Sequence, residues 1–305
     1  MTNLMHFKIW YFIFSLVLIL PGLYYLFSSG LKLGIDFTGG ALLEYKLSLP
    51  PQSGGRLQGT VDSGQLKKSI SDQGIEVGQI ISTSDNTYII RTKPLDQEHI
   101  NKIKSVLIEK YGQAEERRVE NVGPVIGEEL KRKSITALIV ASIFIVLYIA
   151  FSFRQVSKPA SSWRFGITAI VALFHDILLI IGVFAILGKF LGVEVDTLFV
   201  TALLTIIGFS VHDTIVVFDR IRENLQKNIG KKFTEVANIS VVQTLGRSLN
   251  TSLTVIFVLI ALLLFGGETI KWFVVALLIG IISGTYSSIF NATALLVWWE
   301  EKLGH

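Results

Sequence analysis

The stretch VDTLFVTALLTIIGFSVHDTIVVFDRIREN (residues 195–224) decides the fold of this 305-residue chain. Its apolar run from Val195 to Phe218 is long enough to cross about 30 Å of hydrocarbon as a helix. One acid, Asp213, interrupts the run about 9 Å along such a helix from Asp219 and about 25 Å from Asp196. The segment therefore predicts a membrane-spanning helix that carries a carboxyl group at hydrocarbon depth.

Five further apolar runs have the length of membrane spans. They cover Ile9 to Phe27, Ile135 to Phe153, Phe165 to Leu187, Leu249 to Phe265, and Trp272 to Trp299. The first run resembles a signal peptide in its small pair at Ser28 and Gly30, but it exceeds a typical signal core and more spans follow, which favours an uncleaved anchor. We predict a polytopic α-helical membrane protein with six transmembrane helices, the first at 9–28 and the other five within 135–299.

Composition agrees with a bilayer as solvent. Half of the residues are hydrophobic, 17% are charged and the mean hydropathy is +0.56, which excludes an ordinary soluble domain. The absence of cysteine excludes disulfides, thiol redox chemistry and cysteine metal sites. The net charge of +4 comes from loops beside apolar runs, so we expect contact with lipid and not with nucleic acid. We expect no cofactor and no metal.

Basic residues predict the orientation of the chain. They concentrate in two short loops on the N-terminal side of the membrane, the second at 219–248: Arg154, Lys158 and Arg164, and then Arg220, Arg222, Lys227, Lys231, Lys232 and Arg247. Short cytoplasmic loops carry an excess of Lys and Arg, so both termini are predicted to be cytoplasmic. Between Lys232 and Leu245, mixed apolar and polar residues predict a helix lying along the cytoplasmic membrane surface.

Residues 34–130 have the hydropathy of a small soluble domain, which the topology places outside the cytoplasm. Polar spacers such as 50–55 separate its predicted elements. Strands are expected at 41–47, 77–83, 87–92 and 115–122, a helix at 63–73 capped by Asp62 or Ser63, and a second helix with Ile100, Ile103, Val106 and Leu107 on one face. This is the β-α-β-β-α-β order of a ferredoxin-like α+β fold.

Asp213 is the principal candidate functional residue. An ionised carboxylate in hydrocarbon costs several kcal/mol unless it is protonated, paired or hydrated, which makes a functional role the default. Ser210, His212 and Thr214 surround it with polar groups that could line a wet path. We predict a proton site, with a helix–helix hydrogen bond as the alternative.

Two other spans carry polar groups. Asp176, beside His175, lies about 18 Å from Arg164 by helical rise, near the bilayer midplane. It could extend a proton relay with Asp213, or it could be held neutral by hydrogen bonds that lock helix packing, and both roles remain open. On the fifth span Arg247, Asn250 or Thr251, and Thr254 share a face, from which Arg247 is expected to reach Asp213; the alternative is that it snorkels to headgroups.

Three motifs resemble the SecD/SecF family of protein-export membrane proteins, and in particular its SecF branch. They are GIDFTGG at 34–40, GFSVHDTIVVFDRIREN at 208–224, and RSLNTSLT at 247–254, supported by VGPVIGEEL at 122–130. One departure is His212, where many family members carry Asn. Asp36, with Gly39 and Gly40, matches a family signature that suggests coupling between a helix and the outer domain, although an acid among glycines can also be a turn residue.

The resemblance implies a SecD partner with a related six-helix half, both halves belonging to the resistance-nodulation-division group, in the bacterial cytoplasmic membrane. It implies assistance to the SecYEG channel, in which the proton-motive force helps draw an unfolded translocating polypeptide outward. Positions matching Asp213 and Arg247 are implicated in the family. The hypothesis from sequence is that protons passing Asp213, with Arg247 as electrostatic partner, move the outer domain.

Rival functions also remain. A small-molecule or lipid transporter of the same superfamily would share the buried acids but normally needs larger outer domains. A structural scaffold for SecD or the channel would carry no protons. An enzyme is not expected, because the Gly-x-Gly-Asp signature of presenilin-type proteases is absent at Asp176 and Asp213.

Overall fold

The computed structural model describes residues 4–48, 61–83, 86–154 and 161–303. The predicted spacer at 50–55 and the loop residue Lys158 lie outside these ranges. Within them, contacts divide the chain into two units. The helical unit is Met1–Lys32 with Ser134–His305, and Leu33–Lys133, which contains the predicted outer domain, is called the outer unit.

Six helices in the described ranges are long and apolar enough to cross a membrane, which confirms the six predicted spans. A short η1 (Leu4–Phe7) leads into α1 (Lys8–Ser29), and α5 (Pro124–Ser152), α6 (Ser162–Leu191), α7 (Thr197–Lys227) and α8 (Phe233–Phe265) follow the outer unit. The last span is built from α9 (Glu268–Tyr286), the π-helical η3 (Ser287–Asn291) and α10 (Ala292–Leu303). This last span and α7 are the two most buried spans, whereas α1, α5 and α8 are mostly exposed.

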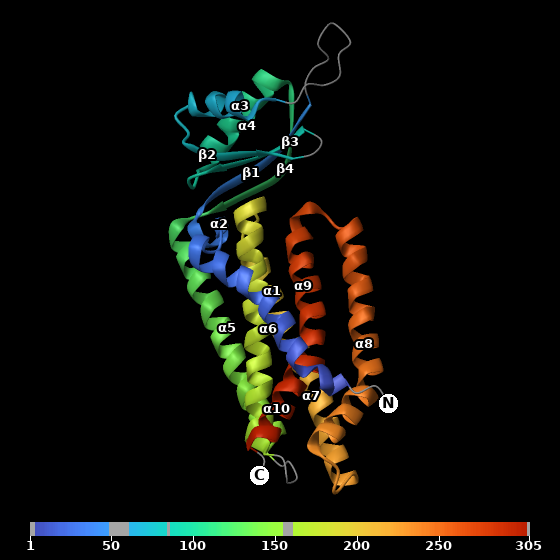
Figure 1. Ribbon diagram of the computed structural model, residues 1–305. Helices are drawn as coiled ribbons and strands as arrows, with labels where there is room; N and C mark the ends of the chain where they lie inside the picture. The colour runs from blue at the N-terminus through green and yellow to red at the C-terminus, as the bar shows by residue number, and fades with distance from the viewer. Residues whose placement is uncertain (1–3, 49–60, 84–85, 155–160, 304–305) are drawn as a thin grey trace. The chain divides into compact units, whose positions relative to one another are not determined.

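Helix α1 crosses α6 obliquely (Figure 1) at a pair of glycines. A Cβ atom added to Gly182 would lie 2.8 Å from Gly22 Cα, and one added to Gly22 would lie 2.7 Å from Gly182 Cα. Small residues let two backbones approach in this way where lipid removes the usual hydrophobic driving force. The pair therefore fixes where the first span docks.

Gly182→Ala is expected to lower the free energy of unfolding by about 1–3 kcal/mol, the usual cost of overpacking. The added methyl group would meet the backbone of Gly22, which cannot rotate away. Gly166→Ala in the same helix is the matched control, since its Cβ would meet nothing within 4 Å. Thermal unfolding of the detergent-solubilised protein compares the two, and equal stability would contradict a backbone contact at Gly182.

The segment 232–245, predicted as a helix along the membrane surface, is helical and packs its apolar side on protein. It forms the first turns of α8, and its apolar side is fully buried at Val236, Ala237 and Val241. These residues share a core cluster with Phe218 and Ile221 of α7. The tertiary packing of the helix ends thus gives this amphipathic stretch a protein partner.

The outer unit holds α2 (Ile35–Thr38), β1 (Gly40–Ser48), α3 (Ser63–Ser71), β2 (Val77–Ser82), β3 (Thr87–Thr92), α4 (Gln97–Tyr111) and β4 (Gln113–Val122). From β1 onward the order agrees with the predicted β-α-β-β-α-β order, with ends shifted by at most two residues. The sheet order is β2-β3-β1-β4, and all three neighbouring pairs are antiparallel.

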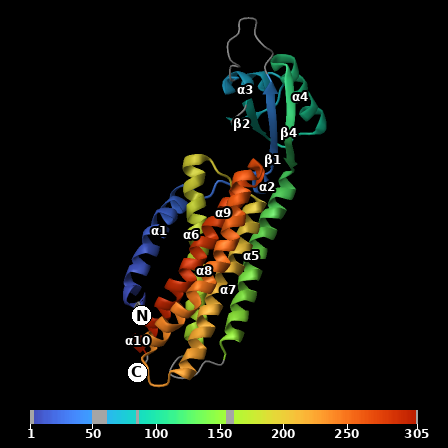
Figure 2. The same ribbon diagram turned by 90° about the vertical axis from the view of Figure 1, so that its right-hand side faces the viewer.

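One face of this sheet packs on α3 and α4 (Figure 1) and forms the core of the unit. The four apolar residues predicted on one face of α4 are all buried, as are Leu43, Tyr45 and Leu47 of β1. The side chain of Asp62 caps α3 by accepting hydrogen bonds from the backbone N–H groups of Gly64 and Gln65, so Asp62 is the cap. Figure 2 shows the strands and both helices from the side.

Two buried tyrosines in this core differ in the hydrogen bonding of their hydroxyl groups, so removal of the hydroxyl is expected to change stability differently at each. Tyr88 Oη accepts from Val61 N at 2.7 Å and donates to Val61 O at 3.0 Å. The hydroxyl of Tyr45 has no hydrogen-bond partner in the described structure, and burial, with Glu116 nearby, raises the pKa of Tyr45 to about 12.

Tyr88→Phe is expected to cost about 1–3 kcal/mol of stability, because the Val61 amide is left buried and unpaired. Tyr45→Phe removes an unsatisfied group and is expected to be neutral or stabilising. Chemical denaturation of the full-length protein, monitored by a signal from the outer unit, measures the stability of both variants. A loss of stability in Tyr45→Phe as large as in Tyr88→Phe would show that its hydroxyl is bonded.

Candidate functional site

Asp213 lies where α7, α8 and α9 meet, and only 7% of the residue is exposed. Its Oδ2 accepts a hydrogen bond from Thr285 Oγ1 of α9 at 3.3 Å. Thr285 Oγ1 in turn lies 2.6 Å from Ser252 Oγ of α8. The nearest basic atom with which it forms an ion pair is Nδ1 of His212, at 3.7 Å, on a ring that is two-thirds exposed. The acid is thus buried among hydroxyl groups.

Ser252 and Thr285 were not among the residues selected from the sequence. The signal that could have found Ser252 is the i, i+4 series Ser240, Thr244, Ser248, Ser252 on α8, whose four members are all buried. The stripe chosen from the sequence began at Arg247 instead. Both stripes have helical spacing, so periodicity alone could not decide between them.

The predicted approach of Arg247 to Asp213 is not what the structure shows. Both residues lie in the described ranges, where no ion pair joins them, and Arg247 is exposed. Asn250, Thr251 and Thr254 are exposed on α8 as well. The hydroxyls of the two threonines donate to their own helix, Thr251 to Arg247 O and Thr254 to Thr251 O. The physical reason is rotation about the helix axis: α8 turns its serine face, and not this stripe, toward α7 and α9.

Asp176 is the most enclosed acid of the helical unit, with 1% of the residue exposed. Its Oδ2 accepts from Ser210 Oγ at 2.5 Å and from Ser287 Oγ at 2.6 Å. Its Oδ1 lies 3.0 Å from His175 Nδ1 and accepts from Ser283 Oγ at 3.4 Å. Short bonds of this kind are typical of hydroxyl groups that donate to a carboxylate. This donor set ties α6 to α7 and to the last span.

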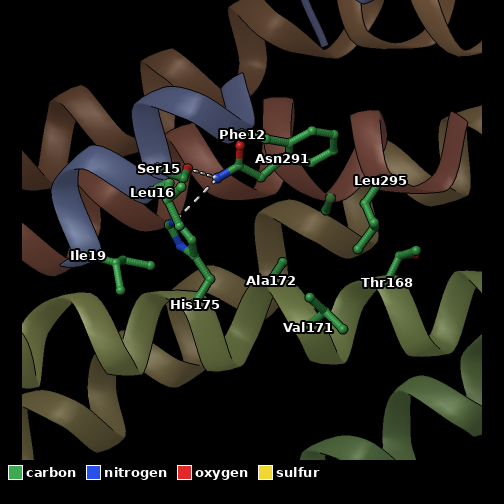
Figure 3. Close-up of a pocket in the computed structure, with 11 residues that line it drawn as sticks. Phe12, Ser15, Leu16, Ile19, Thr168, Val171, Ala172, His175, Asn291 and Leu295 are labelled. Atoms are coloured by element: carbon green, nitrogen blue, oxygen red, sulfur yellow. Dashed lines mark hydrogen bonds between the residues drawn. The ribbon is translucent and has the colours of Figure 1, made fainter. Parts of the chain in front are cut away.

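A polar chain continues from His175 toward α1 (Figure 3). Asn291 Nδ2 lies 3.3 Å from His175 Nε2 and donates to Ser15 Oγ at 2.5 Å. If Nε2 accepts from the amide, Nδ1 of a neutral imidazole carries the proton and donates to Asp176. A cavity of about 190 Å³ lies beside this chain, with an almost wholly apolar lining that includes Phe12, Leu16 and Leu295.

The predicted lining residues Ser210 and Thr214 are buried, but they contact other groups than Asp213. Ser210 donates to Asp176, and Thr214 Oγ1 donates to Ser288 Oγ at 2.9 Å. Ser288 Oγ donates to Ser210 O at 2.7 Å. Both Ser287 and Ser288 point inward because they begin the π-helical turn, a feature often found at functional sites.

Asp36, Gly39 and Gly40 belong to the outer unit, at the turn into β1. Gly39 and Gly40 have φ values of 72° and 137°, which favour glycine, and a Cβ on Gly40 would lie 2.9 Å from Thr92 O. Asp36 is partly buried in the first turn of α2. The backbone conformation at these two positions therefore requires glycine.

No metal centre is formed by the side chains that the structure describes: they contain no group of three His, Cys, Asp or Glu residues placed to hold an ion. The polar groups gathered in the helical unit are two carboxyls, one half-buried imidazole and a set of hydroxyls. Such a set can bind and pass protons, and it offers no strong nucleophile or electrophile.

Comparison with known proteins agrees with the motifs. The family described as "Protein export membrane protein SecD/SecF, C-terminal" matches residues 102–302, and the "SecD/SecF GG Motif" matches residues 24–48. The protein translocase subunit SecF of Thermobaculum terrenum is 47% identical over 99% of this chain and 95% of its own length, and SecF of Anaerolinea thermophila is 39% identical with the same coverage.

Longer relatives contain this chain as a part. The protein translocase subunit SecDF of Bacillus subtilis is 35% identical over 96% of this chain, which spans 37% of that protein. The crystal structure of SecDF from Thermus thermophilus, a translocon-associated membrane protein, superposes with a TM-score of 0.82 at 33% identity over 98% of this chain and 39% of that one. With its six apolar helices and these matches, the chain belongs to the SecD/SecF family of bacterial protein-export membrane proteins.

Proposed function

We propose that this chain is the SecF-type half of a membrane device that uses the proton-motive force to assist late steps of protein export. The observation that carries the proposal is the environment of Asp213: a carboxyl group almost wholly buried in an apolar helix, with hydroxyl neighbours and the imidazole of His212 at 3.7 Å, and with no Lys or Arg among the described residues within ion-pair distance. Such a group can exchange a proton, because no strong cationic partner locks it as a carboxylate.

The proposed partner is SecD, which supplies the second half. Support comes from relatives in which both halves form one chain, since this chain spans 37% of the Bacillus subtilis SecDF and 39% of the Thermus thermophilus SecDF. A second support is the exposure of polar groups on spans α7 and α8, namely His212, Arg247, Asn250, Thr251 and Thr254. Polar groups facing lipid are costly, so a protein surface is expected to cover them. In this arrangement Arg247 faces SecD.

The energetic step is small and repeatable. A proton that crosses 100 mV releases about 2.3 kcal/mol, and one pH unit adds about 1.4 kcal/mol. Asp176, which accepts several hydrogen bonds at once, is proposed as the fixed acceptor that holds α6, α7 and the last span together. Of the two roles open from the sequence, this geometry favours the structural one for Asp176.

The proposed topology has both termini in the cytoplasm and the outer unit, with its predicted bounds of 34–130, on the far side of the membrane. There it would hold and release an emerging unfolded polypeptide next to the SecYEG channel. Asp36, Gly39 and Gly40 lie at the entry to β1, where a movement of the first span would enter the outer unit.

Export into vesicles that contain this chain, SecD and SecYEG tests the proposal. We expect export to slow when a protonophore collapses the proton gradient and to stay slow when a gradient of another ion is imposed in its place. Export that is equally fast with and without a proton gradient would support the rival role as a structural scaffold.

A further inference from the structure

The buried face of α8 carries a line of hydroxyl groups that no part of the mechanism above uses. Ser240, Thr244, Ser248 and Ser252 follow one another at intervals of four residues. All four are buried, with exposed fractions of 0%, 6%, 1% and 6%. Residues four apart lie one above the other on a helix, so these hydroxyls form a line along α8 inside the protein.

One end of the line reaches Asp213 by hydrogen bonds. Ser252 Oγ lies 2.6 Å from Thr285 Oγ1, and Thr285 Oγ1 donates to Asp213 Oδ2 at 3.3 Å. The two hydroxyls can reverse their donor and acceptor roles, because each carries one hydrogen and two lone pairs. A proton on Asp213 can therefore be exchanged through Thr285 with Ser252.

The other end reaches an exposed polar cluster at the beginning of α8. Ser240 Oγ accepts from Asn224 Nδ2 at 2.9 Å, and the same amide donates to Gln243 Oε1 at 2.9 Å. Gln243 is exposed and also accepts from Arg220 Nε at 2.7 Å. Water has access to this cluster, so the line connects solvent at one end with the buried acid at the other.

The middle of the line contains an unsatisfied group. Ser248 Oγ is buried and has no hydrogen-bond partner in the described structure. Buried polar groups are rarely left unpaired, and an ordered water is a common partner. Ser240 Oγ donates to Val236 O at 2.7 Å and Thr244 Oγ1 donates to Ser240 O at 3.0 Å, so these two hydroxyls have to turn from their own helix to pass a proton. Side chains four apart on a helix are about 5–6 Å from each other, which two O–H···O bonds of about 2.8 Å through one water would span in each interval between Ser240 and Ser252.

We propose that the line Ser240, Thr244, Ser248, Ser252 and Thr285, completed by water in the intervals on either side of Thr244 and Ser248, is the path by which protons pass between the α8 end of the protein and Asp213. This inference rests on the proposed function of Asp213 and adds the route. Each hydroxyl or water accepts one proton from one neighbour and gives one to the next, so a single proton is transferred along the line and no group keeps a net charge.

The decisive variant is Ser248→Ala in the complex with SecD, reconstituted into liposomes that contain a pH dye. Because its hydroxyl bonds to no described group, its loss is expected to leave the unfolding midpoint unchanged. Proton uptake after an acid pulse is nevertheless expected to fall about tenfold, the effect of about 1.4 kcal/mol on a barrier. Ser252→Ala is expected to slow uptake similarly, and Ser248→Thr, which keeps a hydroxyl, to retain most of it.

Thr293→Val is the matched control, since Thr293 is another buried hydroxyl without a described partner but lies on α10 and is not a member of this line. Thr293→Val is expected to take up protons at the wild-type rate. If Asp213→Asn stops uptake while Ser248→Ala and Ser252→Ala conduct normally, the path is wrong and the function of Asp213 stands. If Asp213→Asn itself conducts normally, the proposed function fails and the path with it.

Discussion

Asp213→Asn is expected to abolish gradient-driven export while the complex with SecD still assembles. Asparagine has nearly the same shape and can still accept the hydrogen bond from Thr285, but it cannot carry a proton. A proton moved through 100 mV supplies about 2.3 kcal/mol. Loss of that energy corresponds to about a 50-fold decrease in the gradient-dependent stimulation of export.

The measurement is export into vesicles with and without a proton gradient, at equal amounts of assembled complex. Asp219→Asn is the control, because it makes the same substitution on the same helix at an exposed residue paired with Arg222. Full gradient-dependent export by Asp213→Asn would show that the acid is only a packing group. Equal losses in both variants would point to a general effect of charge on α7.

Asp176→Ala is expected to have the largest effect on stability. It leaves the hydroxyl of Ser210 without its acceptor, that of Ser287 with only the longer bond to Gly284 O, and Nδ1 of His175 without its partner, in a site that is closed to water. A buried donor that loses its acceptor costs about 1–3 kcal/mol, so the loss of the two short bonds is expected to cost about 2–6 kcal/mol. Unfolding of the solubilised protein by heat or denaturant measures this cost.

Asp176→Asn separates the structural role from a role in proton transfer. Asparagine keeps one acceptor oxygen, so it is expected to lose less stability than alanine and to retain gradient-dependent export. Stable protein without gradient-dependent export would instead make Asp176 a member of the proton path, the other role open from the sequence. Ser288→Ala is a useful reference, because that hydroxyl bonds to Ser210 O and to Thr214 but not to a carboxylate.

Much of the fold could be predicted from local pattern. The strands and helices of the outer unit have ends within two residues of those expected, because alternation, caps and turns are properties of neighbouring residues. The amphipathic segment at 232–245 has a pattern that suits a membrane surface and a protein core equally well. Its burial against Phe218 and Ile221 depends on residues of α7 and could not be read locally.

In the candidate site, too, the positions of the acids could be predicted from the sequence, whereas most of their hydrogen-bond partners could not. Hydropathy and helical rise located Asp213 and Asp176 inside the membrane spans, since depth along a helix is fixed by residue number. The partners of these acids were mostly missed. Thr285, Ser252, Ser283 and Ser287 contact the carboxyls from other helices, at sequence separations of more than thirty residues.

The sequence by itself therefore determined the solvent of this protein, the number of its spans, the order of its outer elements and the depth of its two acids. Only the tertiary structure decided the rotation of each helix about its axis, which turned the serine face of α8 inward and left Arg247 exposed. The physical reason is that a helix offers several faces of similar spacing, and the choice among them depends on close packing such as that of Gly284, where an added Cβ would lie 3.3 Å from Ser210 Cβ.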